Sequence, residues 1–201
     1  MASALTADML KAALKSIDDF AARELPDSVL IELDERDEFP EELVRRMSSG
    51  DELGLQLVFV PFEYGGMGGG ALDVYRVCER MAALDLGLAT SELATQLGSD
   101  PIRVGGTDAQ KREYMTRIAK DGVLFAYGAT EPEAGSDLGA LKTVAEPVCE
   151  NGTVTGYRIS GVKQWFSNGG VADLYTILAL APGGPSWFVV DAGADGFTHG
   201  E

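Results

Sequence analysis

One segment of the sequence combines residue types that could hold a ligand. It reads Tyr-Gly-Ala-Thr-Glu-Pro-Glu-Ala-Gly-Ser-Asp over residues 127–137 and follows a strand-like run. Thr130 and Ser136 supply hydroxyls, and Pro132 stiffens a turn. The backbone N–H groups around Gly135 could form a concavity that binds an anion. Propensity alone explains an ordinary strand-to-turn connection equally well, so both interpretations stay open at this point.

The charged side chains near this segment have a structural as well as a chemical interpretation. Glu131 and Asp137 could act as acid or base, but we interpret both as acceptors that fix the loop by binding nearby N–H groups. The basic side chains of the second half are expected to be solvated strand residues: Lys142, Arg158 and Lys163.

A glycine-rich stretch at residues 66–71 matches the dinucleotide-binding pattern G-x-G-x-x-A, and Asp85 lies at about the expected distance downstream. That pattern requires a strand that runs directly into the first glycine and is followed by a helix. Residues 61–64 intervene after the strand-like residues 57–60, and the lysine of a phosphate-binding loop is missing. We therefore expect a flexible connection between two helices.

Composition excludes several kinds of site. Cys78 and Cys149 are 71 residues apart and His199 is the only histidine, so no metal site is expected. A Ser-His-Asp triad would depend on a histidine two residues from the end. The 16 Lys and Arg residues against 32 Asp and Glu residues give a net charge of −16, which disfavours nucleic acid as a partner.

Other features indicate the compartment. The first residues do not resemble a signal peptide, and the apolar run at residues 174–181 is too short to span a membrane. Two free thiols fit a reducing environment, so a cytoplasmic protein is expected. A length of 201 residues with 45% apolar side chains suggests one large domain or two small ones.

Two kinds of element must position these residues. Residues 1–49 contain no glycine, and apolar side chains recur at helical spacing through the first part of the chain. The predicted helices cover residues 6–21, 40–47, 74–84, 90–97 and 107–119. Helices joined by such short connections form a bundle.

After residue 122 the pattern changes to short β-branched and aromatic runs separated by turns. The predicted strands cover residues 123–129, 142–148, 155–160, 162–167, 174–181 and 186–191. Strands at that spacing suggest an antiparallel barrel or sandwich. We expect an α+β protein with an N-terminal helical bundle at residues 1–121, followed by an incomplete antiparallel β-barrel domain at residues 122–201.

The loop at residues 127–137 closely resembles the signature of the acyl-CoA dehydrogenase family. These flavoproteins remove two hydrogens across the Cα–Cβ bond of a fatty acyl thioester. Residues 157–169, Tyr-Arg-Ile-Ser-Gly-Val-Lys-Gln-Trp-Phe-Ser-Asn-Gly, resemble the family's second flavin segment. Residues 61–68 and 106–111 resemble landmarks of its helical domain. Four landmarks in order over nearly the whole chain are far more specific than any one of them.

The resemblance implies FAD as the cofactor, with a hydride passing from the substrate Cβ to flavin N5. Backbone amides and hydroxyls would then stabilise the charge that develops near N1 and O2. Trp165 would cover one side of the ring, and Ser167 stands where the family commonly has threonine and would reach N5. The implied cofactor residues are Tyr127, Ala129, Thr130, Gly135, Ser136, Trp165, Phe166 and Ser167.

The resemblance also implies a site for the acyl-CoA substrate. Ser136 would lie at the substrate end, and Leu93 and Leu97 would form an apolar wall of the acyl pocket. Simpler roles exist for several of these residues. Tyr127 and Trp165 could be core aromatics of the barrel, Leu93 and Leu97 could belong to the bundle core, and Thr130 could be only a turn residue.

Family members continue into a C-terminal four-helix domain that carries the glutamate base. The resemblance therefore implies no catalytic base within this chain, which alone is expected to be inactive. It also implies a role in fatty acid metabolism, an electron-transfer flavoprotein as electron acceptor, and a homodimer or homotetramer. Alternatives are an acyl-CoA oxidase or flavin monooxygenase of the same fold, or a non-catalytic binding or assembly module.

Overall fold

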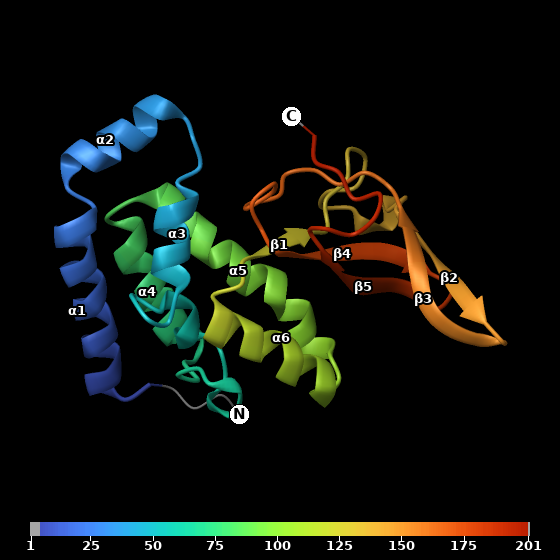
Figure 1. Ribbon diagram of the computed structural model, residues 1–201, viewed down its shortest axis with the longest axis horizontal. Coiled ribbons are helices and arrows are strands. Elements are labelled where there is room, and N and C mark those ends of the chain that lie inside the picture. The colour runs from blue at the N-terminus through green and yellow to red at the C-terminus, as the bar shows by residue number, and fades with distance from the viewer. Residues whose placement is uncertain (1–4, 201) are drawn as a thin grey trace.

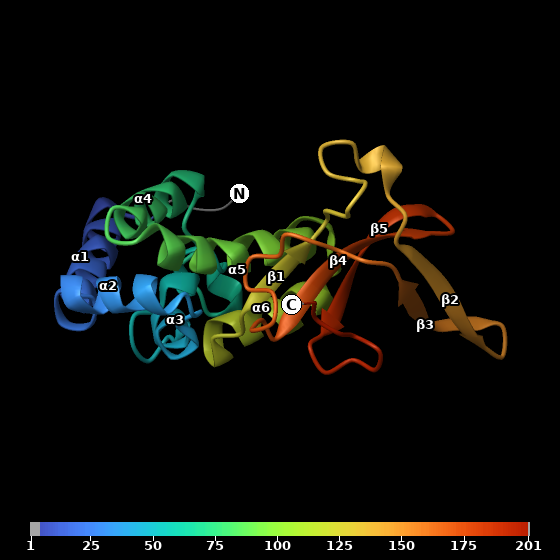
Figure 2. The ribbon, with the colours of Figure 1, turned by 90° about the horizontal axis from the view of Figure 1, so that it is seen from above.

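The computed structural model describes residues 5–200 as a group of helices beside a twisted sheet (Figures 1 and 2). The helices are α1 (Ala7–Glu24), α2 (Asp27–Arg36), α3 (Glu41–Ser48), α4 (Ala71–Ala82), α5 (Leu86–Gly105) and α6 (Asp108–Asp121). Short 3₁₀ turns lie at Leu55–Val58, Phe62–Tyr64 and Leu138–Ala140. The strands are β1 (Phe125–Gly128), β2 (Val144–Glu150), β3 (Thr153–Ser160), β4 (Leu174–Ala181) and β5 (Gly184–Asp191).

Helix caps explain where several helices begin. The Thr6 hydroxyl accepts from the Met9 amide at the start of α1, and the Asp85 carboxylate accepts from the Leu88 amide at the start of α5. Thr107 and Gln110 cap α6 reciprocally. The five predicted helices are confirmed, although α5 is much longer than predicted.

Helix α2 was not expected from the sequence. None of its residues is buried, and Ile31 is 58% exposed. Its apolar side chains therefore do not form the buried stripe on which periodicity depends.

Helix α5 lies against the sheet and connects the two parts of the molecule (Figure 2). The buried Thr95 hydroxyl accepts from the Phe125 amide at 3.1 Å, and the Thr176 hydroxyl donates to the Gly98 carbonyl at 2.7 Å. A Cβ at Gly98 would lie only 2.7 Å from the Cβ of Phe125. This close approach requires glycine at the position.

The sheet is open and mixed, whereas an antiparallel barrel was expected. Strand β4 pairs antiparallel with β5 along one edge, and β2 pairs antiparallel with β3. On its other edge, β4 pairs in parallel with β1 and, at Val144 opposite Leu180, with β2. The order of helical bundle then β domain is confirmed, but two pairings are parallel and the sheet does not close. Six of the eight β4 residues are buried, which is typical of a central strand.

The strand predicted at residues 162–167 is wrong. These residues form no regular element, and Trp165 has a φ of 63°. A left-handed backbone is incompatible with an extended strand, so the chain turns at this residue. The segment is instead held by the loop that follows β1.

The glycine-rich stretch at residues 66–71 is the helix-to-helix connection that the sequence suggested. It runs from the 3₁₀ turn at Phe62–Tyr64 into α4. A Cβ on Gly66 would lie 2.0 Å from the carbonyl oxygen of Val60, and the Gly70 amide donates to the Asp73 carboxylate. Its glycines allow close packing against residues 58–62.

Candidate functional site

The two segments that suggested a ligand site meet beyond the end of β1. The Gln164 amide donates to the Thr130 carbonyl at 3.0 Å. The Lys163 ammonium donates to the Ala129 carbonyl at 3.1 Å. Residues 129–131 and 163–164, far apart in the sequence, are therefore joined by hydrogen bonds.

A buried ion pair holds this junction together. The Lys163 ammonium lies 2.8 Å from the Glu131 carboxylate, and the two side chains are only 6% and 4% exposed. The Lys142 and Thr143 amides donate to the same carboxylate at 2.7 and 2.9 Å. Three connecting segments, at residues 131, 142–143 and 163, thus converge on one buried charge.

The partners of Glu131 determine its protonation. Burial alone would raise the pKa of Glu131, but the Lys163 ammonium and two backbone amides outweigh burial and hold the pKa at about 2. Burial lowers the pKa of Lys163, and Glu131 partly opposes this effect. Glu131 is therefore the loop-fixing acceptor that we expected, whereas the prediction of a solvated Lys163 is wrong. The long Lys163 side chain reaches the buried Glu131 carboxylate, and no local sequence pattern could reveal this contact between residues 32 positions apart.

The other charged residues of this region behave as expected. The Asp137 carboxylate accepts from the Gly139 amide at 2.9 Å and fixes the next turn. Arg158 is exposed, and the Lys142 ammonium forms an exposed ion pair with Glu133.

The surface around the junction carries most of the implied cofactor residues. Gly135, Ser136 and Ser167 are exposed, and Thr130 is half-buried. Trp165 is 82% exposed, so it is not a core aromatic. A large aromatic ring in solvent on a left-handed backbone is unusual and marks a candidate binding surface.

Other implied cofactor residues pack against the strands of the sheet. The Tyr127 ring lies 4.7 Å from the Trp187 ring of β5, and burial raises the pKa of Tyr127. The Phe166 ring packs so closely on β1 that a Cβ at Gly128 would lie 2.6 Å from it. Ala129 is 8% exposed, so its side chain is buried while its carbonyl accepts from Lys163.

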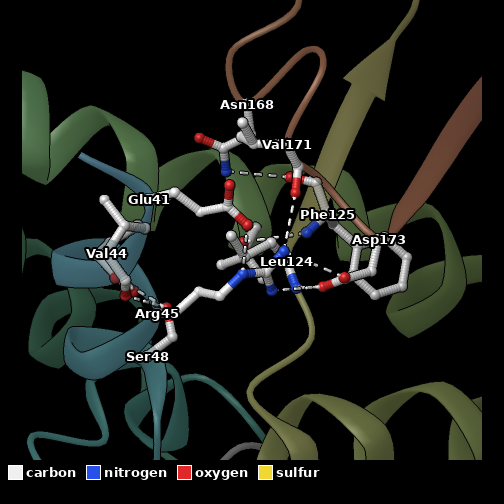
Figure 3. Close-up of polar contacts among 11 residues, drawn as sticks. Glu41, Val44, Arg45, Ser48, Leu124, Phe125, Asn168, Val171 and Asp173 are labelled. Carbon is white, nitrogen blue, oxygen red and sulfur yellow. Dashed lines mark hydrogen bonds and ion pairs between the residues drawn. The ribbon is translucent and has the colours of Figure 1, made fainter. Parts of the chain in front are cut away.

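The loop that carries Trp165 is fixed by residues that the sequence did not single out (Figure 3). The buried Asn168 amide group donates to the Ser91 carbonyl at 2.9 Å and the Phe125 carbonyl at 3.3 Å. Asn168 has a φ of 62°, a conformation that asparagine tolerates. Asn-Gly-Gly at residues 168–170 is typical of a turn, but the contact of Asn168 with α5 depends on tertiary packing and could not be predicted.

An arginine of α3 anchors the end of the same loop (Figure 3). The Arg45 guanidinium donates to both oxygens of Asp173, at 3.1 and 3.3 Å, and to the Val171 carbonyl at 3.1 Å. Asp173 also accepts from the Leu124 amide at 2.9 Å. The helices and the sheet are thus connected beside the candidate site.

The implied acyl-pocket residues lie on α5. Leu93 and Leu97 are 38% and 49% exposed and do not belong to the buried core of the bundle. They occupy a different face of α5 from Thr95 and Gly98, which contact the sheet. This apolar face is available to a ligand or another segment of protein.

Two kinds of feature were not found in the part of the chain that the structure describes. No helix within residues 5–200 is long and apolar enough to cross a membrane. Over the same residues, no three His, Cys, Asp or Glu side chains gather to form a metal site.

Comparison with known proteins identifies the family. Residues 8–121 match the acyl-CoA dehydrogenase N-terminal domain, and residues 126–201 match the acyl-CoA dehydrogenase middle domain. An acyl-CoA dehydrogenase of Bacillus subtilis (strain 168) is 34% identical over 196 residues, which cover 93% of this chain and 48% of that protein.

Two solved structures share the fold. Butyryl-CoA dehydrogenase from Megasphaera elsdenii has a TM-score of 0.86 at 32% identity, covering 100% of this chain and 52% of that one. An acyl-CoA dehydrogenase complexed with FAD from Bacillus anthracis has a TM-score of 0.81 at 32% identity, covering 96% and 32%. The chain spans about half the length of the Bacillus subtilis and Megasphaera elsdenii proteins. On both sequence and structure, it belongs to the acyl-CoA dehydrogenase family.

Proposed function

We propose that this chain contributes the FAD-binding and acyl-binding surfaces of an enzyme that dehydrogenates the Cα–Cβ bond of an acyl-CoA thioester. The observation that carries the proposal is the convergence of residues 129–131 and 163–164 beside the exposed ring of Trp165. A flavin against Trp165 would remove this ring from water, while the buried Glu131–Lys163 pair would hold the two segments together.

The residues present suit a flavin. Trp165 offers an aromatic face for one side of the ring, and the Thr130 and Ser167 side chains offer hydroxyl donors. Gly135 and Ser136 are exposed, so their amides can approach a cofactor closely. When bound, FAD would supply the acceptor for the hydride that leaves Cβ. This chain's own contribution is to bind, orient and cover the flavin ring.

Leu93 and Leu97 would form an apolar wall for the acyl chain, with Ser136 at the substrate end of the site. Glu131 is unsuited as the base that removes the α-proton, because its pKa is about 2 and Lys163 and two amides already bind it. We propose that another carboxylate supplies the base, and that a cytoplasmic homodimer or homotetramer passes its electrons to an electron-transfer flavoprotein.

The complete gene product should bind FAD, and Trp165→Ala should weaken this binding. Stacking and burial of an aromatic ring contribute on the order of 1–3 kcal/mol, so the Kd for FAD should rise roughly 5- to 150-fold. Flavin absorbance after equilibrium dialysis measures the Kd. Tyr75→Ala, which removes an exposed aromatic ring from α4, is the matched control and should leave the Kd unchanged. An unchanged Kd in Trp165→Ala would reject the role of this ring.

A second readout separates the possible classes of protein. Anaerobic addition of acyl-CoA should bleach the flavin spectrum of the dehydrogenase. A non-catalytic binding module would bind FAD without bleaching, and an oxidase would regain its colour rapidly on exposure to air.

A further inference from the structure

Two residues with left-handed backbones lie on either side of Phe166 and Ser167. Trp165 has a φ of 63° and Asn168 has a φ of 62°. The other non-glycine residues with positive φ among those described lie at ordinary turns, after α2 and between β2 and β3. A left-handed backbone is strained for a residue with a Cβ, and such strain persists only where the surroundings enforce it. The contacts of this turn therefore bear on its function.

The backbone of Asn168 closes the turn. The Gly169 amide donates to the Phe166 carbonyl at 3.2 Å. The Asn168 carbonyl accepts from the Val171 amide at 3.2 Å and from the Ala172 amide at 2.9 Å. These bonds make one compact turn around Asn168.

The side chain of Asn168 attaches the turn to two other elements (Figure 3). Its Nδ2 donates to the Ser91 carbonyl of α5 at 2.9 Å and to the Phe125 carbonyl of β1 at 3.3 Å. Both partners are acceptors, so the position requires a side chain with two donors on one nitrogen. The side chain is only 6% exposed, so these two bonds are shielded from water.

Asparagine is not the least strained residue for this backbone. Glycine adopts a left-handed conformation without strain, and Gly169 and Gly170 follow directly. Asn168 Oδ1 is buried and accepts no hydrogen bond from the described residues, which destabilises the folded state. The favourable contribution of the side chain is therefore its two donated bonds, and these determine where the turn lies.

The turn presents side chains that we assign to the flavin. Ser167 adjoins Asn168, and the exposed ring of Trp165 lies at the other end of the turn. Helix α5, to which Asn168 attaches the turn, also carries Leu93 and Leu97, which we assign to the acyl chain. One helix therefore supports both the flavin-facing turn and the apolar face.

We propose that Asn168 is a positioning residue for the flavin: its carboxamide holds Trp165 and Ser167 against α5 and β1 in the arrangement that receives the ring. The inference rests on the proposed function, which assigns these two side chains to the flavin. A turn that is fixed in advance need not be ordered when the cofactor binds. A fixed turn also sets the orientation of the ring relative to an acyl chain on α5.

Hydrogen exchange tests whether Asn168 fixes the turn. Mass spectrometry follows the amides of residues 169–172 in the complete gene product, with FAD bound and after its removal. Their hydrogen bonds should protect them in the wild-type protein in both states. Asn168→Gly keeps the left-handed backbone but removes the carboxamide, so these amides should exchange at least about 10-fold faster.

Thr176→Val is the matched control for this experiment. It removes a buried hydroxyl that likewise connects the sheet to α5, and it should leave the amides of residues 169–172 protected. Unprotected amides in the wild-type protein would overturn the inference, even if Asn168→Gly fails to fold. Equal exchange in Asn168→Gly and the wild-type protein would also overturn it.

Measurements on the FAD-loaded protein connect the turn to the flavin. The Kd for FAD should rise roughly 10-fold in Asn168→Gly, because binding must then order the turn. At saturating acyl-CoA, anaerobic rapid mixing should show flavin reduction slowed by roughly 10- to 100-fold, the effect expected of a small displacement at the reacting groups. The Kd for acyl-CoA should change by less than about threefold, because the apolar face of α5 is unaltered. Thr176→Val should leave all three values unchanged.

The inference and the proposed function fail through different results. If Asn168→Gly matches Thr176→Val in FAD binding and reduction rate, or weakens acyl-CoA binding as much as it slows reduction, the positioning role is wrong. Bleaching of the wild-type flavin by acyl-CoA would still support the dehydrogenase in that case. If FAD binding depends on Asn168 but no acyl-CoA bleaches the flavin, the dehydrogenase proposal is wrong and the positioning role stands. A complete gene product that does not bind FAD would reject both.

Discussion

Two buried glutamates in this protein have opposite charge states. Glu131, at the junction of the two loop segments, has a pKa of about 2, whereas Glu92, a buried residue of α5, has a pKa of about 8. Their exposed fractions are 4% and 8%, so solvent exposure alone does not distinguish them, although Glu92 lies deeper in the fold than Glu131. The difference lies in the number and charge of their partners.

Glu131 accepts from two amides and from an ammonium, so its charge is fully compensated. Glu92 has only uncharged neighbours, the Ser48 hydroxyl and the Gln56 side chain, which lower its pKa only in part. A compensated buried charge can make a junction rigid, whereas a buried acid without a cation remains mostly neutral at pH 7. The comparison therefore shows that a cation and backbone amides are what keep a buried glutamate ionised in this protein.

The largest expected effect comes from removing the ammonium group that pairs with Glu131. Lys163→Met keeps much of the side-chain volume but leaves a buried carboxylate without its ammonium. Loss of one partner from a buried ion pair typically costs about 3–5 kcal/mol, and we expect a loss in this range. Urea unfolding at pH 7 measures it. Lys142→Met removes an ammonium that is exposed in its pair with Glu133 and should cost at most about 1 kcal/mol. Equal losses in both variants would mean that Glu131 does not depend on Lys163.

A pH series tests Glu92. Its pKa is raised in the folded protein, so folding favours the protonated form, and this contribution is complete below the ordinary pKa of 4.5. The contribution then declines as pH rises from 4.5 and is lost by about pH 8. At 1.36 kcal/mol per pKa unit, the wild-type free energy of unfolding should fall by roughly 2–3 kcal/mol between pH 5 and pH 7.

Glu92→Gln should remove this decline, because an amide does not titrate. Urea unfolding at pH 5, 6 and 7 compares the slopes of the two proteins. Glu131 does not interfere in this range, since its stabilising contribution is lost only as pH falls from 4.5 towards 2. A wild-type slope that persists in Glu92→Gln would show that another group titrates.

Local sequence signals account for much of the fold. Thr6 and Thr107 cap α1 and α6, which were predicted because capping and periodicity act over a few residues. The cap of α5 at Asp85 was missed, and this helix was predicted only over residues 90–97. The parallel pairing of β1 with β4 was missed. The continuous apolar run of β4 carries a signal for a central strand, but the choice of its neighbours depends on residues about 50 positions apart.

The candidate site was predicted in part for the same reason. Tyr127 and Trp165 lie in segments that the resemblance singled out, but it could not reveal that Lys163 reaches Glu131. Glu92 was missed entirely, because a glutamate between apolar residues on a helix usually faces solvent. Its burial follows from the packing of α4, α5 and the turn at Leu55–Val58.

The smallest expected effect comes from the hydroxyl beside Glu92. Ser48→Ala removes the hydrogen-bond partner of Glu92 Oε1, and one lost hydrogen bond costs about 1 kcal/mol. The Ser48 hydroxyl also lowers the pKa of Glu92, so its removal should raise that pKa further. The pH-dependent decline in stability should then continue to a higher pH than in the wild-type protein. Urea unfolding from pH 5 to pH 9 measures both effects. Thr90→Ala removes a hydroxyl that likewise donates to a helix carbonyl but faces solvent, and it should leave the pH profile unchanged. A Ser48→Ala profile that ends at the wild-type pH would show that the Ser48 hydroxyl does not stabilise the ionised form of Glu92.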